Sequence, residues 1–414
     1  MEEIGTRLEA YVNEGWATRY AILLADLPAK VARAPLTLCG MGVCIDARVS
    51  LHDLAVALTA PSAEAVAFAR VLQDRAARGV GGELAYHWPA GPAWIAAHCR
   101  VERAMGGTGP HAAWVLTAAG APALLALEDR SAAMLRVMPA DILLAEDDAL
   151  VPARAVVPRG EARPEVFIFE YTAGHPVGEV VPSRSSRIIV RFADLGLEHD
   201  AAFDAAARRH AGQAGTGLVS GFSAVPAAEM ARECARVFGL VRDWRAAGLD
   251  TVHLELAGYD PPDGVHEVLA AARGLITSVG MSHSEFRALR DEGADLGQAL
   301  ALFADDLAVD RVCIHADHWA AAVTRRDPEV EEEALLTGCL LAAVRAGAGR
   351  PVRPEALPAG SSFATLPFPA RRSFGPWHFV ACPSPYLAQP ATTLGLGDTF
   401  TAGCLLALGQ ERRG

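Results

Sequence analysis

The feature that most limits the fold is a rhythm in the second half of the chain. From about residue 215, short apolar runs alternate with segments whose apolar residues recur at helical spacing. The runs are GLVSGFSAV, TVHLELA, GLITSVG, RVCIHA and HFVACP, and helical patterns follow them at 225–247, 263–272, 284–290, 329–346 and 399–408. Strands that alternate with helices form βαβ units, because parallel strands need a crossover connection. The rhythm predicts an α/β fold with a mainly parallel sheet and helices on both faces.

The first half of the chain adds elements of two kinds. The run 36–46, LTLCGMGVCID, is predicted to be a buried strand, and Pro110 can begin a helix. Two segments, 47–100 and 139–190, contain more Pro and Trp and short alternating runs such as VFIFEY and RIIVRF. A chain of 414 residues allows two or three structural units.

We therefore expect two domains. The segments 47–100 and 139–190 would form a small β-containing lid domain, inserted into a large α/β domain made of 1–46, 101–138 and 191–414.

The charge balance argues against two kinds of partner. The chain has 37 Lys+Arg against 49 Asp+Glu, a formal net charge of -12, which disfavours nucleic acid and anionic membranes. The stretch 104–127 is uncharged and long enough to span a bilayer, but its glycines and prolines divide it into a turn, a helix and a strand. We expect no nucleic-acid or membrane partner.

The cysteines and the N-terminus indicate the compartment. The eight cysteines are scattered without a CxxC pair and lie mostly in apolar runs, which is typical of reduced core residues. The N-terminal segment is charged and amphipathic and lacks the apolar region of a secretion signal. We expect a cytoplasmic protein, either a monomer or a small homo-oligomer.

A single lysine restricts the chemistry further. Lys30 is the one lysine of the chain, and it stands in LPAKVAR with no glycine nearby. A Walker-type P-loop is therefore excluded, because its lysine follows a glycine-rich turn. The same count argues against a protein kinase and against a Schiff-base lysine.

The strongest local motif is TTLGLGDTFTAG at 392–403, followed by an apolar helical run. Gly395 and Gly397 allow a tight turn, and the helix start offers free N–H groups for a phosphate or a developing anion. Asp398 could accept a hydroxyl proton as an alcohol attacks a phosphoryl group. On spacing alone, Asp398 could equally be an ordinary helix N-cap.

A second glycine motif, GGTGPH at 106–111, also enters a helix. Gly106 and Gly107 would let the backbone approach a small polar ligand, and the helix start offers donors, although a plain turn explains the motif as well. The run 40–45 lacks the third glycine of a dinucleotide-binding fingerprint, so that function is rejected.

In TVHLELA, His253 and Glu255 alternate with apolar residues, so both polar side chains share one face near the end of the predicted strand. Ligands of open α/β sheets gather beyond these strand ends. A buried glutamate paired with an arginine is the structural alternative for Glu255.

Together these motifs resemble the ribokinase superfamily, and within it the ADP-dependent glucokinase and phosphofructokinase family. The run 253–257, HLELA, is similar to the HxE motif of that family, and SVGMSHSE at 278–285 is similar to its NxxE region. Further similarities lie at 187–189, 219–222, 312–315 and 393–398. Two departures are Ser282 in place of the NxxE asparagine and Gly42 at the start of the family's Asn-x-Asn-x-Asp pattern.

The resemblance implies a ribokinase-like fold and a role for each matching residue. Mg²⁺ would be held by Glu255 and Glu285, although SHSE is also a capping-box pattern for Glu285. The implied sugar-binding residues are Asp46, Glu83, Gly107 and Thr108, and the implied nucleotide-binding residues are Arg187, Thr393 and Leu396. Arg187 could instead be a surface charge.

With these motifs, the resemblance implies an ADP-dependent sugar kinase. By the same resemblance, the enzyme would use Mg²⁺ and transfer a phosphoryl group from ADP to glucose or fructose 6-phosphate. Asp398 would be the general base, and the backbone amides of Gly395, Gly397 and Asp398 would stabilise the transferred group. Three alternatives stay open: an ATP-dependent ribokinase-type sugar kinase, a catalytically weakened homologue that binds sugar or nucleotide, and a plain structural role for the motifs.

Overall fold

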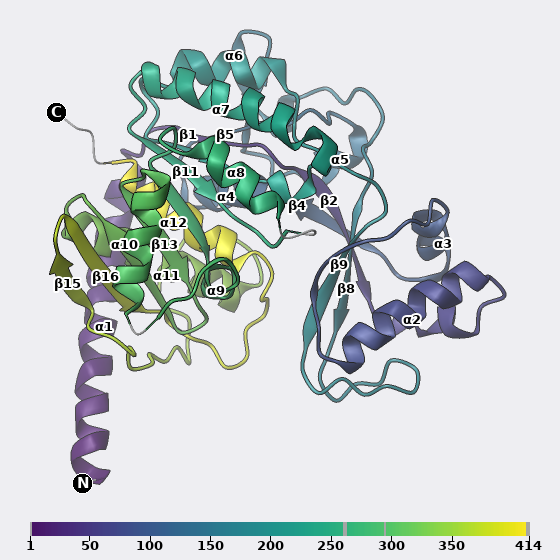
Figure 1. The fold of residues 1–414 in the computed structure, drawn as a ribbon, viewed down its shortest axis with the longest axis horizontal. Coiled ribbons are helices and arrows are strands. Elements are labelled where there is room, and N and C mark those ends of the chain that lie inside the picture. Colours follow the sequence, from purple (N-terminus) through teal and green to yellow (C-terminus); the bar gives the residue numbers. More distant parts are fainter. Residues whose placement is uncertain (1, 260–262, 294, 411–414) are drawn as a thin grey trace.

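A computed structural model describes residues 2–259, 263–293 and 295–410, and the side chains of the first helix from residue 15 onward. Two β-sheets organise these residues, and the chain crosses between them several times (Figure 1). Within the described residues, none of the helices combines the length and apolar character needed to cross a bilayer.

The large sheet has 11 strands and is parallel through its centre. Its order is β15 (Arg371–Phe374), β16 (Trp377–Pro383), β14 (Trp319–Thr324), β13 (Arg311–His315), β12 (Ser278–Ser282), β11 (Thr251–Glu255), β10 (Thr216–Val219), β1 (Thr37–Cys39), β5 (Ala123–Leu125), β6 (Leu143–Glu146), β7 (Ala149–Pro152). The strands from β13 to β6 are parallel, and antiparallel strands complete both edges. The predicted mainly parallel sheet is confirmed.

Helices cover both faces of the large sheet, because successive strand residues point to opposite sides. Leu38 packs into one core and Cys39 into the other, and Leu124 and Leu125 divide in the same way. The first core contains residues of α6 (Ala201–His210), α7 (Met230–Ala246), α8 (Gly264–Ala272), α9 (His283–Leu289) and α10 (Leu296–Leu307). The second contains residues of α1 (Glu2–Val31), α4 (Thr108–Ala119), α5 (Ala132–Val137), α11 (Pro328–Ala348) and α12 (Leu396–Leu408).

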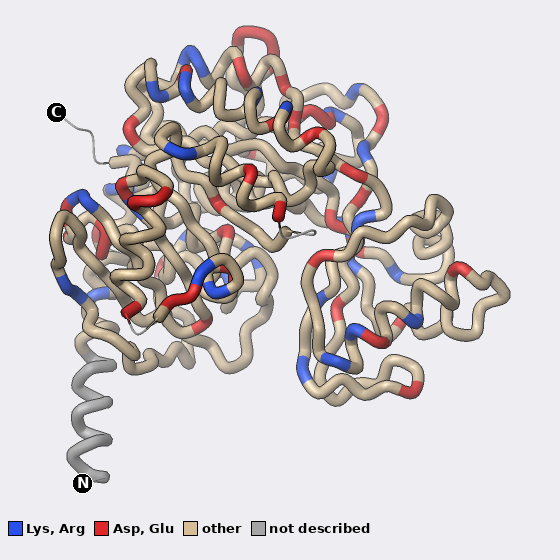
Figure 2. Tube along the Cα trace, viewed as in Figure 1, with Lys and Arg blue, Asp and Glu red and all other residues tan. Residues whose placement is uncertain are grey.

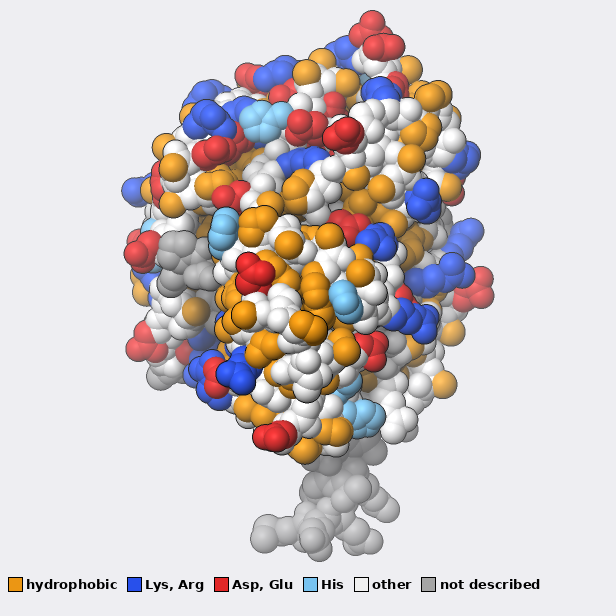
Figure 3. All heavy atoms as spheres, turned by 90° about the vertical axis from the view of Figure 1, so that its right-hand side faces the viewer, with side chains coloured by type: hydrophobic (Ala, Val, Ile, Leu, Met, Phe, Trp, Pro, Cys, Tyr) orange, Lys and Arg blue, Asp and Glu red, His pale blue; other side chains and the backbone are white. Residues whose placement is uncertain are grey.

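The small sheet has five strands, in the order β3 (Gly82–Ala85), β9 (Ser186–Arg191), β8 (Val166–Tyr171), β2 (Cys44–Ser50), β4 (Glu102–Gly106). One of its faces packs against α2 (Ala63–Ala77), α3 (Gly91–His98) and a 3-10 turn at Asp53–Thr59 in a separate apolar core around Phe68. Figure 3 views the molecule from this side and shows apolar side chains among scattered charges. Val56, Val71 and Val80 are among the large hydrophobic residues that remain exposed.

The run 36–46 is not one strand, as predicted, but two strands in different sheets. β1 ends at Cys39 in the large sheet, and β2 begins at Cys44 in the small one. The chain turns where it passes very close to Gly221: a Cβ on Gly42 would lie 2.8 Å from the Gly221 Cα. Two glycines at this crossing allow a backbone approach that side chains would block.

The sheets also differ from the predicted segment boundaries. β6 and β7 lie within 139–190 but pair with the large sheet, where Leu143 aligns with Leu124. β4 was expected in the large domain but pairs with β2 in the small sheet. Which sheet a strand joins is decided by pairing between residues far apart in the sequence. The composition of a segment does not reveal this pairing. Strands β14 and β15 and helix α10 were not predicted.

Candidate active site

Two cavities adjoin where the small sheet meets the carboxyl ends of the central strands and the start of α12. The small cavity, of about 240 Å³, lies between the sheets and is lined by Gly42, Val43, Cys44, Asp46, Glu83, Gly107, Thr108, His111, Val166, Ile168, Arg187, Ile189, Arg191, Leu195, Gly196, Gly221, Ser223, Ala224, Glu255, Ala257, Leu394, Gly395 and Asp398. The large cavity, of about 690 Å³, includes Arg187, Ser282, His315, Tyr386, Thr393, Leu396, Gly397 and Phe400.

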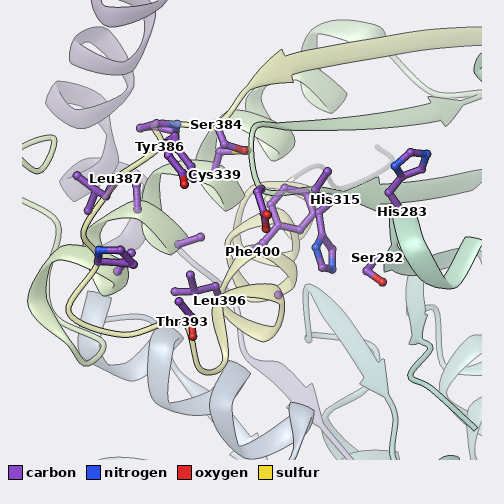
Figure 4. Close-up of a pocket in the computed structure, with 18 of the residues that line it drawn as sticks. Ser282, His283, His315, Cys339, Ser384, Tyr386, Leu387, Thr393, Leu396 and Phe400 are labelled. Atoms are coloured by element: carbon purple, nitrogen blue, oxygen red, sulfur yellow. The ribbon is translucent and has the colours of Figure 1, made fainter. Parts of the chain in front are cut away.

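The large cavity is elongated (Figure 4). Tyr386 and Leu387 lie at one side, Ser282 and His283 lie at the other, and Phe400 is among the residues between them. Several alanines of α11 contribute to the wall. The cavity therefore joins an apolar and aromatic end to a polar end.

The GLGD motif forms the turn into α12. Gly395 is the N-cap and has a left-handed backbone with φ 66°, a conformation that glycine adopts readily. Asp398 lies in the first turn and is half-buried. Its carboxylate has no hydrogen-bond or ion-pair partner among the described side chains. Asp398 is therefore not the N-cap, and it is free to face the small cavity.

Four predicted sugar-binding residues line the small cavity from the small sheet and the start of α4. Asp46 comes from β2, Glu83 from β3, and Gly107 and Thr108 from the turn into α4. Gly107 is held against Gly42, since a Cβ on Gly107 would lie 2.4 Å from Gly42 O. The tertiary structure brings these four residues together with Asp398.

Asp46 is the most perturbed of these carboxyl groups. It is 6% exposed, and burial raises its pKa to about 7. The negative charges of Asp398 and Glu83 raise it further, while a contact with the Cys44 thiol lowers it. A Cβ on Gly106 would lie 2.1 Å from Asp46 Oδ1, so the absence of a side chain there gives this carboxyl group its room.

Two arginines face the cavities from β9. Arg187 lines both cavities, so its position fits a phosphate that lies between them. Arg191 lines the small cavity, donates to Ser223 O and lies 3.6 Å from the Glu83 carboxylate. Sequence reasoning missed Arg191. Lysine plays no part here, because Lys30 pairs with Glu333.

Basic and acidic residues are interspersed along the tube of the chain (Figure 2). The positive charge at the cavities therefore comes from these individual arginines rather than from a broad basic surface.

Glu255 lies at the centre of a buried hydrogen-bond cluster at the end of β11. Its Oε2 is 2.8 Å from His253 Nε2 and accepts a hydrogen bond from Thr401 Oγ1 at 3.1 Å, and its Oε1 is 3.7 Å from His315 Nε2. Burial works against the charged form, but the hydrogen bond with His253 and the nearby His315 outweigh burial and lower the pKa of Glu255 to about 2. Glu255 is paired with histidines and not with an arginine.

Glu285 closes the capping box of α9. Ser282 N and Ser282 Oγ both donate to Glu285 Oε2 at 2.7 Å, and Glu285 N donates back to Ser282 Oγ. Burial raises the pKa of Glu285, and the nearby charge of Glu255 adds to this effect. The structure thus gives Glu285 the capping role that the sequence offered as one alternative.

The described residues contain no cluster of three or more His, Cys, Asp or Glu arranged to hold a metal ion. Magnesium often binds through only one or two carboxylates and keeps several waters. Glu255 and Glu285 fit this mode, because the contacts between Glu285 and Ser282 use only Oε2 and the Oε1 of Glu255 has only a long contact.

The chain is similar to known proteins in both sequence and fold. The protein-family model described as "ADP-specific Phosphofructokinase/Glucokinase conserved region" matches residues 37–407 of this chain. The ADP-specific phosphofructokinase of Thermococcus litoralis is 29% identical over 187 residues, which cover 37% of this chain and 40% of that protein. The protein of the same name from Pyrococcus abyssi is 27% identical over 190 residues, covering 37% and 41%. The alignment thus spans about two fifths of each relative.

Solved structures share the fold over nearly the whole chain. An ADP-dependent kinase in complex with fructose 6-phosphate and ADPβS has a TM-score of 0.76 at 16% identity, covering 95% of this chain and 98% of that one. A phosphofructokinase from Pyrococcus horikoshii OT3, solved with AMP, has a TM-score of 0.73 at 16% identity, covering 91% and 98%. The predicted ribokinase-like α/β fold is confirmed. This chain belongs to the ADP-specific phosphofructokinase/glucokinase family.

Proposed function

We propose that this protein is an ADP-dependent sugar kinase. The observation that carries the proposal is the placement of one loop between two cavities. Asp398 and Gly395 line the small cavity, Leu396 and Gly397 line the large one, and Arg187 lines both. A sugar hydroxyl in the small cavity and a diphosphate in the large cavity would meet at the start of α12.

The reaction follows from the groups at this meeting point. The sugar hydroxyl oxygen forms a bond to the β-phosphorus of ADP while the bond to the bridging oxygen breaks and AMP leaves. Asp398 accepts the hydroxyl proton, which its unpaired carboxylate can do. The N–H groups at the start of α12 and the guanidinium of Arg187 stabilise the transferred phosphoryl group.

Glu255 and Glu285 are the residues that would hold Mg²⁺ through water. A bound Mg²⁺ neutralises phosphate charge. Closure of the small-sheet region over the large sheet, as the predicted lid, would exclude water from the site.

The acceptor is proposed to be a neutral hexose such as glucose. Asp46, Glu83 and Asp398 all line the small cavity, and carboxylates at this density repel a phosphorylated sugar. Arg191 is already directed at Glu83 and Ser223 O. The family resemblance described above likewise implies a sugar-binding role for Glu83.

Fructose 6-phosphate is the second candidate. Both curated relatives are ADP-specific phosphofructokinases, and Arg187 and Arg191 could bind a sugar phosphate if Arg191 turned away from Glu83. The Glu83→Ala variant separates the two acceptors. If glucose is the acceptor, the kcat/KM of the variant for glucose is lower than that of the parent by about tenfold or more, as expected when a hydrogen bond to substrate is lost. If fructose 6-phosphate is the acceptor, the kcat/KM of the variant for fructose 6-phosphate stays the same or rises.

The test of the proposed function is a coupled assay of the purified protein with ADP, ATP or pyrophosphate against a panel of sugars, with and without Mg²⁺. Transfer from ADP alone supports the proposal. Transfer from ATP in preference to ADP favours the ribokinase-type alternative. Nucleotide binding without transfer to any sugar sinks the kinase proposal and favours a binding homologue.

A further inference from the structure

Arg345 is a buried cation beneath the GLGD loop. It lies near the end of α11 and is 4% exposed. Nη1 donates to Gly395 O at 3.1 Å and to Thr399 Oγ1 at 2.9 Å, and Nη2 is 3.3 Å from His111 Nδ1. One side chain therefore connects α11 to the start of α12 and to the first turn of α4.

The guanidinium of Arg345 is not paired with a carboxylate in the part of the chain that the structure describes. No acidic oxygen of those residues lies within 4.0 Å of it. Other buried arginines are paired: Arg130 contacts Glu146 and Asp200, and Arg311 contacts Glu331. Burying an unpaired cation costs free energy, which a nearby anion can offset. The negative charge that develops on the transferred phosphoryl group would supply that anion.

Electrostatics agree with this placement. Burial lowers the pKa of Arg345, and the negative charge of Asp398 raises it. Arg345 and Asp398 therefore interact across the turn, although they do not form an ion pair.

Gly395 and Arg345 fit each other. A Cβ on Gly395 would lie 2.5 Å from Arg345 Nη2, so the glycine allows the guanidinium to reach the backbone. Arg345 fixes the carbonyl group of this N-cap residue, and Thr399 N and Thr399 Oγ1 bind the same oxygen. The free N–H groups of the first turn then keep a fixed direction out of the helix start.

Arg345 also sets the hydrogen bonding of His111. A guanidinium has only donors, so His111 Nδ1 must accept and Nε2 carries the proton. Burial lowers the pKa of His111 to about 4, so the ring is neutral near pH 7. His111 lines the small cavity and can present its Nε2–H there.

We propose that Arg345 is a positioning residue for phosphoryl transfer. It holds Gly395 O on one side and His111 on the other, which fixes two parts of the small-cavity wall relative to each other, and its charge stabilises the transferred phosphoryl group. This inference rests on the proposed function.

The first test compares Arg345→Met with Arg345→Lys in the coupled assay. We expect Arg345→Met to lower kcat by about 100- to 1,000-fold, as for loss of one preorganised donor. KM for the sugar and the calorimetric Kd for ADP should stay within about threefold. Arg345→Lys keeps the charge and should recover at least tenfold of the lost kcat. A kcat of Arg345→Met within threefold of the parent, or no recovery with lysine, overturns the proposal.

A second measurement separates this inference from the proposed function, because it needs no turnover. Hydrogen exchange of the peptide covering 394–400 should be at least tenfold faster in Arg345→Met than in the parent. Arg130→Lys is the control for a buried arginine elsewhere, and it should leave this peptide unchanged. If the parent transfers phosphate to no sugar, the kinase proposal fails, and unchanged exchange in Arg345→Met would independently contradict the positioning role.

Discussion

His253 Nε2 lies 2.8 Å from Glu255 Oε2, and both side chains are buried at the end of β11. Their strand spacing puts them on one face, where His315 from β13 and Thr401 from α12 reach the same carboxylate. Glu255 therefore links the large sheet to the helix that carries Asp398. A residue in this place serves the stability of the fold as well as the proposed metal site.

Glu255→Gln should destabilise the protein in a pH-dependent way. The folded-state pKa of Glu255 is about 2, below its ordinary value of 4.5, so its stabilising contribution is complete above about pH 4.5 and is lost as the pH falls through about 2. The shift corresponds to about 3 kcal/mol at pH 7. Urea unfolding of variant and parent at pH 7 and pH 3 measures it, and the difference should shrink at pH 3.

Glu292→Gln is the matched control, because Glu292 also pairs with a histidine, His283, at 2.6 Å but in a more exposed setting. Its loss should cost less than about 1 kcal/mol. Equal unfolding free energies for Glu255→Gln and the parent at pH 7 would contradict the first prediction.

Asp398→Asn should remove the general base and leave nucleotide binding intact. The amide has nearly the same shape but does not accept a proton, so kcat should fall by about 100- to 10,000-fold. Calorimetry should give an ADP Kd within about threefold of the parent. The control is Asp327→Asn at the N-cap of α11, where asparagine caps equally well. A kcat of Asp398→Asn near that of the control would exclude Asp398 as the base.

Asp46→Asn should make the folded protein more stable relative to the parent at neutral and higher pH, and it should weaken sugar binding. Burial raises the folded-state pKa of Asp46 to about 7, above its ordinary 3.8. In the parent, Asp46 therefore contributes to the stability of the folded state at low pH, and this contribution is lost as the pH rises through about 7. The variant lacks this loss. Relative to the parent, its unfolding free energy should rise by about 4 kcal/mol between pH 4 and pH 8.

The same Asp46→Asn variant should raise KM for the sugar at least tenfold, because a charged acceptor for sugar hydroxyls is gone. Denaturant unfolding across pH and steady-state kinetics check the two halves. A pH-independent stability difference would refute the assignment of a buried, ionising Asp46.

Gly280→Ala should disrupt the cluster around Glu255 by steric contact alone. Gly280 lies in β12, and a Cβ there would be 2.2 Å from Glu255 Oε2 and 2.6 Å from His253 Nε2. We expect a loss of at least about 2 kcal/mol in unfolding free energy, as for other overpacked interiors. A lower affinity for Mg²⁺ in the assay should accompany it.

Gly239→Ala in α7 has no atom within 4 Å of the added Cβ and serves as the control. It should be neutral or stabilising by about 0.5–1 kcal/mol, because alanine favours helices. Similar stability changes in the two alanine variants would show that the contact with Glu255 is not the cause.

Local patterns predicted most of the second half of the chain. The runs at TVHLELA and RVCIHA form β11 and β13, and the helical pattern at 329–346 forms part of α11. Their hydrophobic periodicity is strong because both faces of the sheet are covered. The run 36–46 was misread, because its apolar residues continue across the glycine turn between two sheets.

Site residues were predictable where a short motif carried the chemistry. Asp398, Gly107 and Glu255 stand in recognisable patterns, and all three line the small cavity. Arg191 and Arg345 had no such pattern, and His111 was given no role although it ends the GGTGPH motif. Arg345 is one arginine among many in the sequence, and only its burial against Gly395 distinguishes it.

The sequence by itself determined the α/β class and the family motifs, because periodicity and glycine turns are local properties of the chain. The tertiary structure decided which strands joined the small sheet, which carboxylate stayed free at the start of α12, and how Arg187 came to line two cavities. These outcomes depend on side chains far apart in the sequence, such as Asp46 and Asp398. Their shared electrostatic environment exists only once the sheets have packed together.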